Sequence, residues 1–357
     1  MPTSAATSVL VVTGRDDLAE RVERLVGAVG LTAHRVRDVE SAGSRWRDVP
    51  LVLLDEEAAA AGVPVRRTGT LLVDDGAGES IWRRAVEVAA EAVVRLPADE
   101  AWLLERLAAA ADGDRSAGRV VGVVGGRGGA GASTLAAGLA ATAAAGGRDV
   151  LLVDADPDGG GLDLLLGAEE EPGLRWEDLH GVRGALRASV LRDGLPVVAG
   201  LRLLSFGRDP GRTRVGIEAV EAVLDAARRG ADLVVVDLPR ADDELRSAVL
   251  WRLDVLVVVV PAEVRAAAAA ALLVARLRAR VPDVRLVVRG PAPTGVAADV
   301  VAEAVGVPVT LLGPDEPQLA ADADHGRVPA LDRPRSGFAR LCRRLLADVH
   351  AAPARAA

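Results

Sequence analysis

The sequence predicts an α/β protein of two domains, each built on a mostly parallel sheet. Its 357 residues are enough for two domains at roughly 100–200 residues each. Apolar, strand-like runs alternate with helix-spaced apolar positions along the chain, which is typical of parallel sheets with helical crossovers. A polar, small-residue stretch separates two such series. We expect a first domain at 1–111, a linker at 112–118, a second domain at 119–350 and a frayed tail at 351–357.

The expected elements follow from hydrophobic periodicity, with period 2 or continuous apolar runs for strands and period 3.6 for helices. In the first domain we expect strands at 9–13, 32–36, 51–54, 70–73 and 92–96, and helices at 15–29, 80–90 and 98–111. In the second domain we expect strands at 120–124, 149–153, 197–205, 233–236, 255–260, 285–288 and 309–312, and helices at 133–145, 216–229 and 262–280.

Composition excludes several classes of protein. With 50% hydrophobic and 26% charged residues, the chain is not generally disordered. A net charge of -8 argues against a nucleic-acid partner bound through overall charge. A single cysteine, Cys342, permits no internal disulfide framework and fits a reducing compartment. The start of the chain does not read as a secretory signal and no apolar run approaches 18 residues, so we expect a cytoplasmic protein.

The residue choice points to a GC-rich genome. The sequence has no lysine, no asparagine and no tyrosine, so all 43 basic residues are arginine. The four histidines are far apart and follow no metal-ligand spacing, which argues against a zinc site.

The strongest local signal is a glycine-rich turn between an apolar strand and a helix, at residues 120–134. Glycines let the backbone approach phosphate oxygens and adopt positive φ. The helix N-terminus that follows presents free N–H groups and a partial positive charge, and Ser133 or Thr134 can offer a hydroxyl to Mg²⁺. We predict a phosphate-binding loop; the alternative is a plain strand-to-helix turn.

Two nucleotide classes fit this loop. Residues 126–131 satisfy G-x-G-x-x-G and Asp154 ends the next strand, as in NAD(P)-dependent oxidoreductases. The other class is a P-loop, but Ala132 stands where its phosphate-binding lysine is expected. The later acids favour the P-loop, because Asp154 and Asp156 end one apolar strand and Asp237 ends another in the form of a Walker B acid. The sequence shows no catalytic His/Tyr/Lys constellation for an oxidoreductase.

This order of motifs resembles the deviant-Walker MinD/ParA ATPases. Their usual loop reads K-G-G-x-G-K-[ST]-[ST], and this chain has Arg127-Gly-Gly-Ala-Gly-Ala-Ser-Thr134. Within that superfamily the chain is most similar to the CpaE/TadZ-like branch and to the actinobacterial CpaE-like proteins also called septum site-determining (Ssd) proteins. Those often have alanine in place of the lysine and a degenerate receiver-like domain in front. The resemblance covers most of 119–346 and, more loosely, 8–111. It implies a receiver-like (flavodoxin-like) domain followed by a MinD/ParA-type P-loop domain.

The resemblance also implies roles for single residues in binding ATP or ADP with Mg²⁺. Asp156 matches the catalytic acid that orients the attacking water. Arg127 matches the signature lysine, which in relatives reaches across a dimer to the partner's phosphates, and a forked guanidinium can keep that contact. The metal-side groups are Ser133, Asp154 and Asp237, and the nucleotide-binding positions are Arg127, Gly128, Gly129, Gly131, Ala132, Ser133, Thr134 and Arg289.

Two departures from the family pattern bear on activity. Ala132 removes a charge-assisted contact worth roughly 1.5–3 kcal/mol. Arg289 stands where relatives often place an asparagine near the adenine. The chain is therefore either a weak ATPase or a pseudo-ATPase that keeps the fold without useful hydrolysis.

The first domain lacks most of the receiver chemistry. Asp55 ends the third strand and matches the phospho-acceptor. Residues 13–14 are Thr-Gly where acids are expected, Asp16 and Asp17 are displaced from that position, and Leu96 stands in place of a lysine. We predict a docking or dimerisation module rather than a phosphorylated receiver.

The last helix has two interpretations. Its apolar face can pack on the ATPase sheet, which we favour, or lie on an anionic membrane like the terminal helix of MinD. The apolar positions are Phe338, Leu341, Cys342, Leu345, Leu346 and Val349, beside Arg340, Arg343 and Arg344.

The sequence therefore predicts a spatial-positioning protein of the MinD/ParA/CpaE type. It would form a homodimer linked to ATP and act with cell-division or pilus/secretion proteins, in septum-site determination or in localising a Flp/tad-type pilus or secretion machine. The alternatives are a non-catalytic pseudo-ATPase scaffold and an NAD(P)-dependent oxidoreductase.

Overall fold

The computed structural model divides the chain into two compact units. It describes residues 8–76, 80–112, 118–183, 186–208, 215–241, 244–281, 283–290 and 295–351. One unit comprises the chain up to Arg115 with Arg183–Ser189, and the other comprises Ser116–Val182 with Val190–Ala357. Residues 183–189 group with the first unit, where the Ala188 N–H donates to the Asp112 carboxylate oxygens at 3.0 Å each. Most of the expected linker and tail, 113–117 and 352–357, lies outside the described residues.

The first unit is a five-stranded parallel sheet in the order β2-β1-β3-β4-β5. This is the flavodoxin-like order of a doubly wound sheet, and it confirms the predicted fold class. Two separate clusters of buried apolar residues cover the sheet, one against α1 and α5 and one against α2, α3 and α4. The strands are β1 Ser8–Val12, β2 Thr32–Val36, β3 Val52–Leu54, β4 Thr70–Asp74 and β5 Ala92–Arg95. The helices are α1 Asp16–Ala28, η1 Glu40–Ala42, α2 Arg45–Asp48, α3 Glu56–Ala60, α4 Ser80–Val88 and α5 Glu100–Asp112.

The second unit is an eight-stranded sheet in the order β13-β12-β11-β6-β10-β7-β9-β8. All its neighbours are parallel except β8 and β9. The central strands are apolar and fully buried, as expected for parallel strands covered on both faces. The strands are β6 Arg119–Gly125, β7 Val150–Asp154, β8 Val197–Val198, β9 Leu201–Leu204, β10 Leu233–Asp237, β11 Val255–Pro261, β12 Val284–Arg289 and β13 Val309–Gly313.

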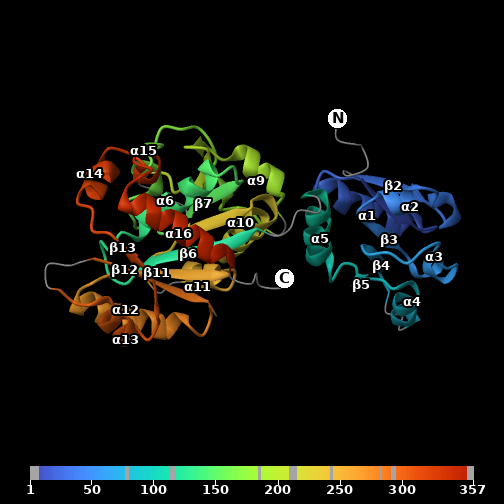
Figure 1. The fold of residues 1–357 in the computed structure, drawn as a ribbon. Helices are drawn as coiled ribbons and strands as arrows, with labels where there is room; N and C mark the ends of the chain where they lie inside the picture. The colour runs from blue at the N-terminus through green and yellow to red at the C-terminus, as the bar shows by residue number, and fades with distance from the viewer. Residues whose placement is uncertain are drawn as a thin grey trace. The chain divides into compact units, whose positions relative to one another are not determined.

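Helices cover both faces of this sheet (Figure 1). On one face α6 and α16 share an apolar core with alternate residues of the central strands. On the other, α10, α12 and α13 contact strands β10 to β13. The helices are α6 Ala132–Ala145, α7 Leu162–Leu165, α8 Trp176–Leu179, α9 Ala188–Gly194, α10 Ile217–Gly230, α11 Glu244–Leu250, α12 Val264–Leu277, α13 Ala298–Val305, α14 Gln318–Asp324, α15 Pro329–Asp332 and α16 Gly337–Ala351.

One expected strand is wrong. The run 197–205 was expected to be continuous, but it is a tight antiparallel hairpin of β8 and β9. Ala199 and Gly200 between the two strands have φ values of 51° and 80°. Backbone in this left-handed region turns the chain, so the apolar pattern continues while the strand direction reverses.

Helix α16 packs on the domain as we favoured. Phe338, Leu341, Cys342, Leu345 and Val349 are buried in the core shared with α6. The packing contradicts the membrane-facing alternative for these side chains, because the apolar face is already covered. None of the helices in the described ranges is long and apolar enough to cross a membrane.

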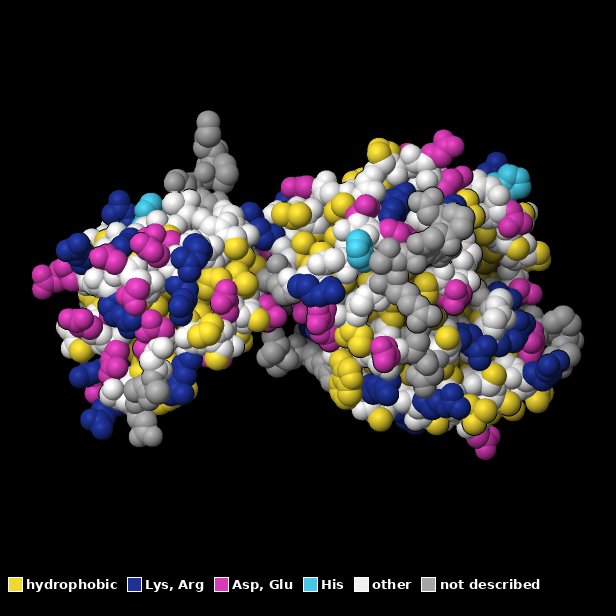
Figure 2. Space-filling model, turned by 180° about the vertical axis from the view of Figure 1, so that it is seen from behind, with side chains coloured by type: hydrophobic (Ala, Val, Ile, Leu, Met, Phe, Trp, Pro, Cys, Tyr) yellow, Lys and Arg dark blue, Asp and Glu magenta, His cyan; other side chains and the backbone are white. Residues whose placement is uncertain are grey.

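The surface charge is mixed. Figure 2 shows arginine side chains beside aspartate and glutamate on the visible face of each unit. The absence of a nucleic-acid partner stays a prediction from the net charge of the chain.

Candidate functional site: a glycine-rich loop over paired acids

The glycine-rich loop joins β6 to α6 at the carboxyl edge of the sheet. Gly129 and Gly131 have φ values of +68° and +92°, in the left-handed region that favours glycine. A Cβ on Gly126 would lie 2.9 Å from the Ala270 Cβ, so the loop passes close to α12. The loop conformation therefore requires glycines for backbone reasons, whatever its ligand.

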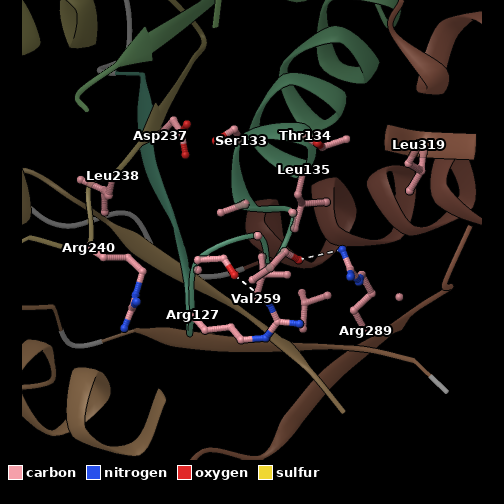
Figure 3. A pocket seen from close by; sticks show the side chains of 18 of the residues that line it. Arg127, Ser133, Thr134, Leu135, Asp237, Leu238, Arg240, Val259, Arg289 and Leu319 are labelled. Atoms are coloured by element: carbon pink, nitrogen blue, oxygen red, sulfur yellow. Dashed lines mark hydrogen bonds between the residues drawn. The ribbon is translucent and has the colours of Figure 1, made fainter. Parts of the chain in front are cut away.

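The loop forms one wall of a cavity of about 630 Å³, within the range of small-ligand sites. Asp156, Asp237 and Arg240 line other parts of it, and Arg289 comes from the end of β12. Figure 3 shows Asp237 and Ser133 close together and the side chains of Arg127, Arg240 and Arg289 elsewhere around the loop. The apolar lining is Val259, Val287, Leu319, Phe338 and Leu341 among others.

Of the predicted site residues, most lie on this cavity. Those that line it are Arg127, Gly128, Gly129, Gly131, Ala132, Ser133, Thr134, Asp156, Asp237 and Arg289. Asp154 is not among the lining residues. The strand register explains the grouping, because parallel strands β6, β7, β10 and β12 bring residues from four separate segments to one edge.

Asp237 is a buried carboxyl that faces the loop. It is 6% exposed, and the Ser133 side chain lies close to it (Figure 3). Burial raises the pKa of Asp237 to about 7, and the nearby Ser133 hydroxyl opposes that shift. The charges of Asp154 and Asp156 raise it further. The charges of these three carboxyl groups thus repel one another, and a cation beside Asp237 would relieve that repulsion.

Asp154 lies directly beside Asp237 in the strand register, but it faces the chain that follows it. Its two carboxylate oxygens accept the backbone N–H groups of Asp156 and Leu162, both at 3.0 Å. Burial raises the pKa of Asp154 to about 6. The dinucleotide alternative needed this carboxylate for a ribose hydroxyl. Its burial at 2% exposure and its two backbone contacts oppose that role.

Arg127 is held by an acid of the same chain. Its Nε and Nη2 donate to the two carboxylate oxygens of Glu263 at 3.1 and 2.9 Å, and Nη1 donates to the Gly128 carbonyl at 2.7 Å. The forked pair keeps the guanidinium beside the loop, about one third exposed. An arginine at the signature-lysine position is therefore already ion-paired within this chain.

Arg240 is a cavity residue that sequence reasoning missed. It follows Asp237 by three positions at the carboxyl end of β10 and is exposed. Its position just beyond a Walker B-type acid was the available signal, because that edge of a parallel sheet is where ligands bind.

The residues present fit a magnesium ion. Among the described residues, no three His, Cys, Asp or Glu side chains form a metal-binding group. Mg²⁺ commonly takes only one or two protein oxygens and completes its shell with phosphates and water. Ser133 and Asp237 provide a hydroxyl and a carboxylate that lie near each other on the cavity, which suits that arrangement.

The receiver-like unit has a second acidic pocket, of about 370 Å³. Asp55 is buried there, and its two oxygens accept the Thr13 hydroxyl at 2.5 Å and the Ala58 N–H at 2.6 Å, which makes it the N-cap of α3. Arg15 bridges Asp75 at 2.7 Å and Asp17 at 2.8 Å. Arg15 lines this pocket, and the two acids that hold it by ion pairs are not among the lining residues. The loss of receiver chemistry stays a prediction.

Comparisons with known proteins address the family. Residues 12–118 match the family described as "Rv3660c-like, CheY-like N-terminal domain", and residues 121–284 match "CobQ/CobB/MinD/ParA nucleotide binding domain". The Mycobacterium tuberculosis protein Rv3660c is 40% identical over 337 residues, which span 92% of this chain and 94% of that one. The match of residues 121–284 to the CobQ/CobB/MinD/ParA domain favours the P-loop interpretation over the dinucleotide alternative.

Two solved structures show the same fold in the second unit. The ParA family ATPase of Chlorobium tepidum has a TM-score of 0.59 at 20% identity and covers 65% of this chain and 99% of its own. The septum site-determining protein MinD of Pyrococcus horikoshii, solved with Mg-ADP, has a TM-score of 0.56 at 20% identity, over 65% and 95% of the two chains. The two family matches and the 40% identity to Rv3660c confirm the predicted family, and the narrower CpaE/TadZ-like placement stays a prediction. The chain thus belongs to the Rv3660c-like proteins, which join a CheY-like N-terminal domain to a MinD/ParA-type nucleotide-binding domain.

Proposed function

We propose that this protein is a nucleotide-dependent spatial-positioning protein that binds Mg-ATP in the cavity below the glycine-rich loop. The observation that carries the proposal is the convergence of that loop, the Ser133–Asp237 pair and Asp156 on one cavity of about 630 Å³. Fixed N–H groups, a hydroxyl and a carboxylate are the groups that a nucleoside triphosphate with Mg²⁺ requires. The Mg-ADP complex of the P. horikoshii relative supports this choice of ligand.

Each residue has a distinct proposed task. The backbone around Gly128, Gly129 and Gly131 wraps the phosphates. Ser133 and Asp237 would hold Mg²⁺, which when bound supplies positive charge to the phosphate oxygens. Asp156, on the cavity wall, orients the attacking water for a slow hydrolysis.

The output we propose is ATP-linked dimerisation, which changes the affinity for a partner protein. ATP can shift the equilibrium between monomer and dimer only if it binds the two states with different affinities. We propose that Arg127 provides this difference in affinity. In a dimer the guanidinium would leave Glu263 and contact the partner's phosphates. The biological setting we propose is septum-site determination or the placing of a pilus or secretion machine.

A specific observation favours a second candidate, a scaffold without useful nucleotide binding. The methyl group of Ala132 replaces the lysine that carries much of the phosphate affinity in P-loops. A scaffold would keep the fold and its partners while the cavity stays free of ATP.

Calorimetry with Mg-ATP and Mg-ADP, followed by light scattering on the same samples, separates the two candidates. The switch predicts ATP binding and a doubling of mass with ATP but not with ADP. Asp156→Ala should keep binding and lose hydrolysis. Unchanged mass and no heat at millimolar ATP would leave the scaffold.

A matched pair of glycine variants controls for backbone strain. Gly131 and Gly147 both have positive φ, at +92° and +82°, but only Gly131 lines the cavity. Gly131→Ala should weaken ATP binding, whereas Gly147→Ala should bind ATP as the wild type does at a comparable loss of stability. Equal binding by both variants would place the nucleotide elsewhere.

A further inference from the structure

Arg289 reaches from β12 onto the glycine-rich loop. It is the last residue of its strand and pairs in register with Pro261 on one side and Gly313 on the other. Its Nη1 donates to the carbonyl oxygen of Ala130 at 3.2 Å, which Figure 3 shows as a dashed line. A Cβ built on Gly131 would lie 3.1 Å from the same nitrogen. The guanidinium thus lies against the segment that immediately precedes Ala132.

The charges around Arg289 and Arg127 differ. Glu263 holds Arg127 through two short hydrogen bonds. Arg289 lies 4.0 Å from Asp315, measured from Nε to a carboxylate oxygen, and the Asp315 side chain is half-exposed. The charge of Arg289 also helps to lower the pKa of Glu263, but no hydrogen bond joins these two side chains among the described residues. A guanidinium has five N–H donors, and the Ala130 contact uses one of them. Arg289 can therefore keep its position on the loop while other N–H groups face an anion in the cavity.

We propose that Arg289 supplies the phosphate-binding cation that this loop lacks at Ala132. The ligand class is the polyphosphate group of a nucleotide, which a guanidinium binds in a forked geometry. The inference rests on the proposed function and goes against the family expectation that this position lies at the adenine. In this chain the positive charge approaches the loop from a neighbouring strand rather than from the loop itself.

The test measures dissociation constants of AMP, ADP, ATP and inorganic tripolyphosphate, all with Mg²⁺, for the wild type and Arg289→Ala. We expect ATP and tripolyphosphate to bind about ten to a hundred times more weakly to the variant. AMP should lose much less, because it has a single phosphate. An equal loss for all three nucleotides would overturn the inference and place Arg289 at the nucleoside. No loss at all would also overturn it.

Two further variants make the test specific. Arg276→Ala removes an exposed arginine of α12 that does not line the cavity, and it should leave all four constants unchanged. Ala132→Lys restores the loop lysine, so in the Arg289→Ala background it should recover most of the lost ATP affinity. If the double variant folds, as judged by its Tm, but recovers no ATP affinity, the loop lysine cannot replace Arg289. That result would contradict the inference.

The outcome also separates this inference from the proposed function. A wild-type protein that binds no nucleotide refutes both. A wild-type protein that binds ATP, with an Arg289→Ala variant that binds it equally well, refutes the role of Arg289 alone.

Discussion

At the residue scale, the site is dominated by buried charge. Asp237 is buried at the sheet edge beside the Ser133 hydroxyl, and the carboxylates of Asp154 and Asp156 lie close enough to raise its pKa. A buried acid of this kind destabilises the fold when it is ionised. Asp237 lies where a bound cation can offset this destabilisation, and a destabilising buried charge in a cavity is typical of a functional residue.

The pKa of Asp237 predicts how stability depends on pH without Mg²⁺. The value of about 7 lies above the ordinary pKa of an aspartate, 3.8, so between these two values the folded state binds more protons than the unfolded state. Stability therefore falls as pH rises from about 4 to 7. Asp237→Asn should be more stable than the wild type at pH 8 by up to about 4 kcal/mol, at about 1.4 kcal/mol per pKa unit.

The difference should shrink towards pH 4, where both side chains are neutral. Urea unfolding at both pH values measures it. Asp193→Asn changes a carboxyl that is 70% exposed and should show no such pH-dependent gain. If Asp237→Asn were less stable than the wild type at pH 8, the ionised Asp237 carboxylate would not destabilise the fold, and the prediction would be wrong.

In the proposed dimer, Arg127 has to leave Glu263 before it contacts the partner's phosphates. The Arg127 hydrogen bond lowers the pKa of this carboxyl, so it is ionised at neutral pH. Glu263→Gln weakens the pair and should make ATP-linked dimerisation tighter by a few-fold, because less interaction is lost when the guanidinium moves. Arg127→Ala should weaken it.

Sedimentation with Mg-ATP measures both dimerisation constants. Glu303→Gln, an exposed glutamate on α13, is the matched control and should dimerise like the wild type. Weaker dimerisation of Glu263→Gln would mean that the ion pair itself belongs to the dimer-competent state.

At the element scale, the close approach of α6 and α16 allows the last helix to pack on the second unit. Gly138 lets α16 lie against α6: a Cβ there would be 2.6 Å from the Phe338 ring and 3.0 Å from the Cys342 sulfur. Burial also raises the pKa of the Cys342 thiol to about 12, so the thiol stays protonated and unreactive at neutral pH. Helix α6, which follows the glycine-rich loop, is thereby held in place by α16.

Gly138→Ala should destabilise the protein by about 1–3 kcal/mol, the usual cost of overpacking. Gly27→Ala is the matched control, since it is also a helical glycine but has nothing within 4 Å of the added Cβ. It should be neutral or slightly stabilising. Thermal unfolding of both variants gives the comparison, and equal Tm values would contradict the tight helix contact.

At the scale of the whole molecule, each unit has its own sheet and its own apolar core. In the first unit, Asp55 caps α3 and Arg15 neutralises neighbouring acids. We predict that this unit keeps its fold without being phosphorylated. We expect nucleotide chemistry in the second unit alone.

Differential scanning calorimetry tests this division. A ligand at 100 times its dissociation constant stabilises its own unit by about 2.7 kcal/mol, so Mg-ATP should raise one unfolding transition by about 5–10 °C. The other transition should not move. Asp55→Asn should leave the ATP-dependent shift unchanged, and a shift of both transitions would show that the two units unfold as one.

Local pattern was enough to predict much of this protein. The glycine run of 125–131, the strand-terminal acids Asp154 and Asp237 and the alternation of strands with helices predicted two parallel α/β units and a nucleotide loop. Such features depend on short-range backbone chemistry and on the rule that parallel strands end at one edge.

Only the tertiary structure decided what each charged group faces. Asp154 turns to backbone N–H groups, Arg127 to Glu263 and Arg289 to the loop carbonyl of Ala130. Each contact joins side chains or backbone from different segments, the last two across more than a hundred residues of sequence. The hairpin at 199–200 is a further example. The hydrophobic pattern predicts one continuous strand there, but the backbone dihedrals of these two residues reverse the chain direction. Sequence pattern determines which faces are buried, but packing determines which partner a buried or half-buried charge meets.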